Sequence, residues 1–72
     1  MKAKIQSTDQ IVEVNGVPAR VWIGTTERGV PFELLITRVS VSRKEDASQF
    51  EEELKEQQVP HVSEMFPPRL VI

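Results

Sequence analysis

The stretch "VNGVPARVWIGTTERGVPFELLITRV", residues 14–39, contains two tight turns between strand-forming runs, and it decides the predicted fold. Asn15-Gly16 favours a two-residue type I′ hairpin loop, because Asn and Gly best tolerate the positive φ that both central positions require. From the turn outward, this loop predicts three cross-strand pairs: Val14 with Val17, Val12 with Ala19, and Gln10 with Val21.

The second turn, within Thr26–Pro31, leaves two registers open, and Gly29 is its expected left-handed residue. A three-residue loop, Glu27–Gly29, predicts the pairs Gly24 with Phe32, Trp22 with Leu34, and Arg20 with Ile36. A two-residue loop, Arg28-Gly29, predicts instead the pairs Ile23 with Leu34 and Val21 with Ile36. This slip of one residue exchanges the two faces of the strand, and we favour the three-residue loop.

The third strand, predicted over Phe32–Ser42, is apolar on both faces. One face carries Phe32, Leu34 and Ile36, and the other carries Leu35, Val39 and Val41. A meander with one face in water would alternate between apolar and polar residues. Both faces of this sheet therefore need cover, and a second molecule or the C-terminal tail can supply what the helix does not.

A helix is predicted after the polar segment Ser42–Ser48. Two capping boxes fit its start, Asp46 with Gln49 or Ser48 with Glu51. Val59-Pro60 ends it, because a residue before proline avoids helical dihedral angles. A thin apolar stripe runs along it: Ala47, Phe50 and Leu54. The predicted fold class is α+β, a three-stranded antiparallel β-meander in the order β-β-β-α with one helix packed on the sheet.

Residues 1–72 are predicted to form a single small domain, in which residues 60–72 are an extended, Pro-rich, apolar tail. The tail can add a short C-terminal strand, cover the second face of the sheet, or dock on a partner. A domain this small buries only about 60% of the surface of its unfolded chain, so its core is marginal. The chain has no cysteine for a disulfide. We therefore expect association with another chain, and a homodimer in particular.

No catalytic, cofactor or metal site is predicted, and we expect a protein that is not an enzyme. His61 is the only histidine, and we predict that it is a surface or tail residue. The acidic cluster Glu51–Glu56 suits a solvated helix face, or a docking face for a basic partner, better than a cation site. No signal peptide and no membrane-spanning run is evident, so we expect a cytoplasmic protein with no membrane partner.

The strongest candidate site combines a tryptophan with arginines. In the favoured register, Trp22 shares a sheet face with Arg20 and Arg38. Three interpretations remain open: a core with arginines at its rim, a protein interface, or a surface that stacks nucleic-acid bases. The net charge of −2 and the absence of tyrosine weigh against nucleic acid. The predicted partner-binding residues are Arg20, Trp22, Arg38, Phe66, Leu70, Val71 and Ile72.

Four motifs together resemble small uncharacterised proteins encoded by bacteriophages and prophages: Arg20-Val-Trp22-Ile-Gly24, Gly29-Val30-Pro31, Ile36-Thr37-Arg38 and the acidic helix Phe50–Glu56. The resemblance covers about half of the chain. It implies a phage or mobile-element protein that inhibits a host or defence protein by direct binding. Two other classes remain open: a single-stranded nucleic-acid-binding sheet, and a small structural component of a phage assembly.

Overall fold

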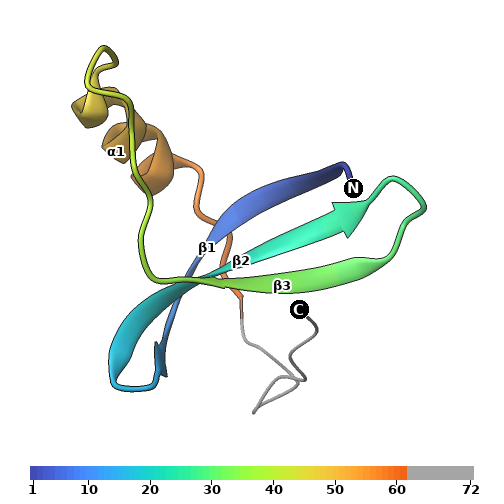
Figure 1. Cartoon of the computed structure of the whole chain (residues 1–72). Coiled ribbons are helices and arrows are strands. Elements are labelled where there is room, and N and C mark those ends of the chain that lie inside the picture. The colour runs from blue at the N-terminus through green and yellow to red at the C-terminus, as the bar shows by residue number, and fades with distance from the viewer. Residues whose placement is uncertain (62–72) are drawn as a thin grey trace.

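The computed structural model describes residues 1–61, which form a three-stranded antiparallel sheet and one helix (Figure 1). Strands β1 (Ala3–Val14), β2 (Val17–Thr26) and β3 (Pro31–Ile36) lie in the order β1-β2-β3, and helix α1 (Ala47–Glu56) follows. The predicted α+β fold with a β-meander is therefore confirmed. The apolar residues of the tail on which further predictions rest lie outside the described residues: Phe66, Leu70, Val71 and Ile72.

The first hairpin closes as the sequence predicts. Asn15 and Gly16 both have positive φ, at 50° and 80°, and they form a two-residue loop with Val14 opposite Val17. The next predicted pair, Val12 with Ala19, is also present. The third, Gln10 with Val21, is wrong, because β1 contains a bulge at this point.

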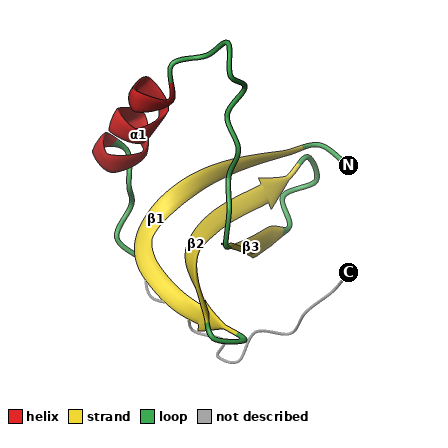
Figure 2. Ribbon diagram, turned by 60° about the vertical axis from the view of Figure 1, so that its left-hand side comes forward, coloured by secondary structure: helices red, strands yellow, loops and turns green. Residues whose placement is uncertain are grey.

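The bulge in β1 is held by side chains. Three residues, Thr8–Gln10, lie opposite the single residue Val21 of β2. The hydroxyl of Thr8 donates to the carbonyl of Val21 and accepts from the N–H of Gln10 at 3.3 Å. The guanidinium of Arg20 donates to the carbonyl of Thr8 at 2.8 Å. Bulges bend strands, and Figure 2 shows β1 and β2 strongly curved.

The second hairpin has the three-residue loop Glu27–Gly29. Gly29 has a φ of 87°, and its N–H donates to the carbonyl of Thr26 at 2.9 Å, while the N–H of Thr26 donates to Val30 at 3.0 Å. The favoured register is confirmed by the pairs Gly24 with Phe32, Trp22 with Leu34 and Arg20 with Ile36.

Gly24 of β2 is buried beneath the ring of Phe32, its direct neighbour on β3. A Cβ at position 24 would overlap three atoms of that ring. The aromatic side chain therefore covers the backbone of the glycine and fills the space that a side chain would otherwise occupy.

Strand β3 ends at Ile36 and does not reach Ser42, so the predicted length is wrong. The bond from the N–H of Thr26 to Val30 shows that even-numbered residues of β2 direct their backbone groups toward β3. Beyond the pair of Arg20 with Ile36, the next such donor would be Pro18, which has no N–H. The ladder stops there, and the chain leaves the sheet toward α1 (Figure 1).

Helix α1 begins after the N-cap Asp46, one of the two predicted starts. Its carboxylate accepts from the N–H of Ser48 at 3.0 Å and from the hydroxyl of Ser48 at 2.6 Å. The helix ends at Glu56, three residues before Val59. No residue of α1 is buried, and of the predicted stripe Phe50 and Leu54 are half-buried while Ala47 is exposed.

After the helix, the chain returns to the outer edge of β1 and forms a single parallel bridge between Val59 and Thr8. The N–H of Val59 donates to the carbonyl of Ser7, and the N–H of Asp9 donates to the carbonyl of Val59, both at 3.1 Å. The only fully buried apolar side chains among residues 1–61 are Ala19 and Val21. The core of the described chain therefore sits at the hairpin, around the bulge.

Candidate protein-binding site

A hollow of about 260 Å³ lies between one face of the sheet and helix α1, and we refer to it as the sheet–helix hollow. Its lining is mostly apolar, and two arginines belong to it, Arg20 and Arg38. The large apolar residues that line it are Ile11, Trp22, Ile36, Val39, Phe50 and Leu54.

The sheet register assembles the floor of the hollow. Arg20 of β2 lies opposite Ile11 on β1 and opposite Ile36 on β3, so the three side chains form a row across the sheet. Trp22 lies two residues along β2 and on the same face. If the register between Ser7 and Trp22 continued without the bulge, Asp9 would occupy the place of Ile11. The bulge thus replaces a carboxylate with an aliphatic side chain.

Helix α1 supplies the other wall. Phe50 and Leu54 are four residues apart, so they lie on the same face of the helix, and both are half-buried. The connecting segment between β3 and α1 contributes Val39, which is 48% exposed. Ile11 is 54% exposed. The hollow is therefore an open apolar surface and not a closed core.

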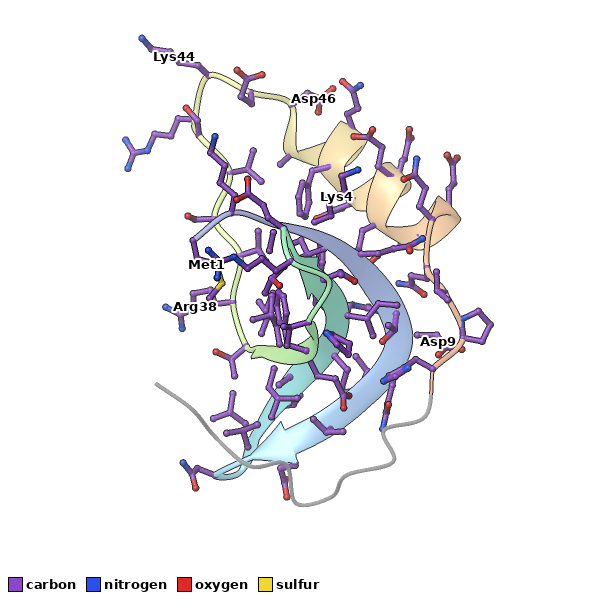
Figure 3. The ribbon with its side chains drawn as sticks, turned by 90° about the vertical axis from the view of Figure 1, so that its right-hand side faces the viewer. Met1, Lys4, Asp9, Arg38, Lys44 and Asp46 are labelled. Atoms are coloured by element: carbon purple, nitrogen blue, oxygen red, sulfur yellow. The ribbon has the colours of Figure 1, made fainter. Side chains whose placement is uncertain are left out.

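The two arginines of the hollow differ in what holds them. The guanidinium of Arg20 is fixed by its bond to the carbonyl of Thr8, so this residue stabilises the bulge as well as lining the hollow. Arg38 is exposed on the segment that follows β3, and Figure 3 shows its side chain extending away from the sheet. Among residues 1–61, Arg38 takes part in no salt bridge.

Three of the seven predicted partner-binding residues, Arg20, Trp22 and Arg38, are brought together around one hollow. The other four lie in the tail outside the described residues. Sequence reasoning did not select Ile11, because its position depends on the bulge. Phe50 and Leu54 were predicted only as an apolar stripe on the helix, since no local pattern reveals which part of the sheet they face.

His61 has a structural role that its isolation in the sequence did not indicate. Its N–H donates to the carboxylate of Asp9 at 3.1 Å, and its Nε2 lies 3.0 Å from Oε2 of Glu33 on β3. These contacts join the chain after α1 to both outer strands. The contact with Glu33 lies on the opposite face of the sheet from the hollow, because Glu33 alternates with Phe32 and Leu34 along β3.

Among residues 1–61, no three side chains of the metal-binding types come together. The glutamates of α1 are exposed. Within the same residues, no helix has the length and apolar character that crossing a bilayer requires.

Comparison with known protein families, curated proteins and solved structures finds no match to this chain. The resemblance to phage and prophage proteins accordingly stays a prediction from the sequence.

Proposed function

We propose that this chain is a non-enzymatic protein-binding module that receives an apolar side chain of a partner protein in the sheet–helix hollow. The observation that carries the proposal is the half-exposure of Ile11 and Val39 beside Trp22 in one concave, mostly apolar surface. Contiguous apolar surface of this kind is typical of interaction sites, and burying it on binding stabilises the complex. Tryptophan and arginine are also the residues most enriched among those that dominate binding energy.

The charge around the hollow indicates the chemistry of the partner. Arg38 is exposed at the hollow, and Arg20 also lines it. Complementary charge across an interface steers association and selects the partner. The favoured ligand is therefore a protein segment that presents a large apolar side chain next to a carboxylate.

Single-stranded nucleic acid is the second candidate, since Trp22 and two arginines could contact bases and phosphates. The protein ligand is favoured because α1, which forms one wall of the hollow, also carries Glu51, Glu52 and Glu53, all exposed. These carboxylates repel a nucleic-acid strand, which carries a charge on every phosphate, more strongly than a protein segment that presents a single carboxylate beside Arg38. A structural role in a phage assembly is the remaining alternative, and inhibition of a host or defence protein in a bacterial cytoplasm is the biological setting that the sequence resemblance suggests.

The test is capture of partners from nuclease-treated bacterial lysate by the tagged chain, with matched charge substitutions. Val39→Glu places a carboxylate at the hollow, and Val30→Glu places one at a similarly exposed site in the second turn. We expect one stoichiometric protein that binds the parent chain and Val30→Glu but not Val39→Glu. Circular dichroism of each variant establishes that the fold is retained.

Two results would contradict the proposal. One is a captured protein that both glutamate variants retain equally, which would place binding elsewhere on the chain. The other is no protein ligand together with quenching of Trp22 fluorescence by single-stranded oligonucleotides that weakens steeply with salt, which would support the nucleic-acid alternative.

A further inference from the structure

Helix α1 is tied to the sheet at its C-terminal end by a short segment, residues 57–61, which we call the strap. Only Gln57 and Gln58 separate the end of α1 from the bridge that Val59 forms with β1. Figure 1 shows the strap running from α1 to the sheet. The link before the helix, residues 37–46, is longer and contains no helix or strand. The strap is therefore the link that restricts where α1 can lie.

The strap is attached to both outer strands of the sheet. Val59 exchanges two backbone hydrogen bonds with β1, and the N–H of His61 donates to the carboxylate of Asp9 at 3.1 Å. Figure 3 shows Asp9 beside the strap. On β3, Oε2 of Glu33 lies 3.0 Å from Nε2 of His61. An ionised carboxylate only accepts, so Nε2 carries the proton and donates it to Glu33.

The bulge in β1 contributes to this attachment. If the register before the bulge continued, Asp9 would lie opposite Arg20 on the face of the hollow. In the bulge, its carboxylate instead accepts from the N–H of His61. The same irregularity thus supplies Ile11 to the floor of the hollow and a hydrogen-bond acceptor to the strap.

Helix α1 makes few contacts that could hold it without the strap. None of its residues is buried, and its contribution to the hollow comes from Phe50 and Leu54, both half-buried. A helix of 10 residues is marginal in water by itself. Both the position and the stability of α1 therefore depend on the strap.

We propose that His61 is a positioning residue for the sheet–helix hollow. By donating to Glu33 on the opposite face of the sheet, its ring holds the strap, and the strap holds α1 as one wall of the hollow. His61 itself lies outside the lining of the hollow. The side chains of His61 and Glu33 are 24% and 23% exposed, so water screens their contact less than it screens a surface pair. The inference rests on the proposed function, because the hollow is the binding site that α1 completes.

His61→Ala tests the inference, because it removes the ring and keeps the backbone N–H that bonds to Asp9. We expect the amide protection factors of α1 to fall about three- to tenfold while those of β2 stay unchanged, since a partly exposed hydrogen bond to a charged group contributes about this factor. Acrylamide should quench Trp22 more strongly, because α1 forms the wall that this single tryptophan of the chain faces across the hollow.

Two further variants separate positioning from general destabilisation. His61→Gln places a side-chain N–H the same number of bonds from Cα as Nε2, so it should restore much of the α1 protection and of the Trp22 shielding. Gln57→Ala is the matched control, since Gln57 is an exposed residue of the strap that caps α1 through its backbone N–H. It should behave as the parent chain does. In a Glu33→Ala background, His61→Ala should have little further effect.

Three results overturn the inference: unchanged α1 protection and Trp22 quenching in His61→Ala, an equal loss of protection in α1 and β2, and a loss that His61→Gln does not repair. Neither measurement uses a partner, so both decide the inference even if the proposed function fails because the lysate yields no ligand. With a captured partner, His61→Ala should retain less of it and His61→Gln should recover it. Undiminished capture by His61→Ala would also overturn the inference.

Discussion

The hairpin of β1 and β2 and the helix end of the sheet are held together by different means. At the hairpin, Thr8, Ala19 and Val21 are at most 1% exposed, and the bulge is closed by hydrogen bonds from side chains. At the helix end, no residue of α1 is buried, and the sheet and helix share only an open hollow. Residues 1–61 thus contain one region that is closed to water and one that is not.

This difference assigns the two regions different roles. Removing apolar surface from water contributes about 25 cal/mol per Å², so the stability of the fold is concentrated where the side chains are buried. A region with few buried contacts opens locally at lower free energy and can adapt to a ligand. The hairpin is therefore the scaffold, and the helix end is the surface that the proposed function uses.

Truncation of one apolar side chain in each region gives the largest expected contrast. Val21→Ala should lower the free energy of unfolding by about 2–3 kcal/mol, because Val21 is fully buried and its removal leaves a cavity. Leu54→Ala should cost about 1 kcal/mol, since that side chain is already half in water. Urea unfolding followed by Trp22 fluorescence measures both. Equal losses would mean that the two regions are not held differently.

Removal of the hydroxyl that closes the bulge should have the next largest effect. Thr8→Val keeps the shape but leaves the buried carbonyl of Val21 without its donor, at a cost of about 1–3 kcal/mol. Thr8→Ser is the control, because it retains the hydroxyl. The same urea assay compares the two variants. A Thr8→Val variant as stable as the parent chain would show that the hydrogen bonds of the bulge do not stabilise the hairpin.

A side chain at Gly24 should destabilise the second hairpin by contact alone. Gly24→Ala brings a Cβ into the ring of Phe32, and overpacking of this kind costs about 1–3 kcal/mol. The backbone at Gly24 has no positive φ, so strain in the turn is not involved. In a double-mutant cycle with Phe32→Leu, the Gly24→Ala penalty should shrink. A penalty that persists unchanged would show that Phe32 is not its cause.

The smallest expected effect is confined to the helix end and depends on pH. The hydroxyl of Ser48, followed by its N–H, donates to Asp46 and holds the pKa of that carboxyl below its ordinary value. Because the pKa is lower in the folded chain, the N-cap stabilises α1 above the unfolded pKa of about 4, and this stabilisation is lost as the pH falls through the folded pKa.

Amide hydrogen exchange and the amide chemical shift of Ser48 report this loss. As the pH falls, the protection factors of the amides, which compare their exchange with that of an unfolded chain at the same pH, should decrease in α1 before they decrease in β2. Asp46→Asn is the matched control, because asparagine caps a helix without titrating in this range. An acid response in α1 that is identical in Asp46→Asn would assign the effect to other carboxyl groups.

Much of the fold is predictable from short-range patterns. The dipeptide Asn15-Gly16 determines the first loop, Gly29 favours the three-residue second loop, and Asp46 caps the helix. The bulge is not predictable in this way, because it depends on a hydroxyl of β1 finding a carbonyl of β2 across the sheet. Pairing from the turn alone therefore fails at Gln10.

The candidate site likewise contains residues whose position short-range patterns predict and residues whose position they do not. The positions of Arg20 and Trp22 follow from the register of the second hairpin, which the sequence favours. Arg38 was predicted on the same sheet face, but it lies beyond the end of β3 on the segment that leads to α1. The meeting of these residues with Ile11, Phe50 and Leu54 does not follow, since it needs the two-residue shift of the bulge and the docking of a helix from far along the chain. The contact of His61 with Glu33 likewise has no local signal.

The sequence by itself determined the elements, their order and the first pairs next to each turn, because turns, caps and alternation act over a few residues. The tertiary structure alone decided where β3 stops, which side chains are sealed around the bulge, and which are left open beside the helix. These outcomes depend on hydrogen-bond partners and packing neighbours that are distant in the chain. A small domain has few such contacts, so it can bury only part of its apolar surface.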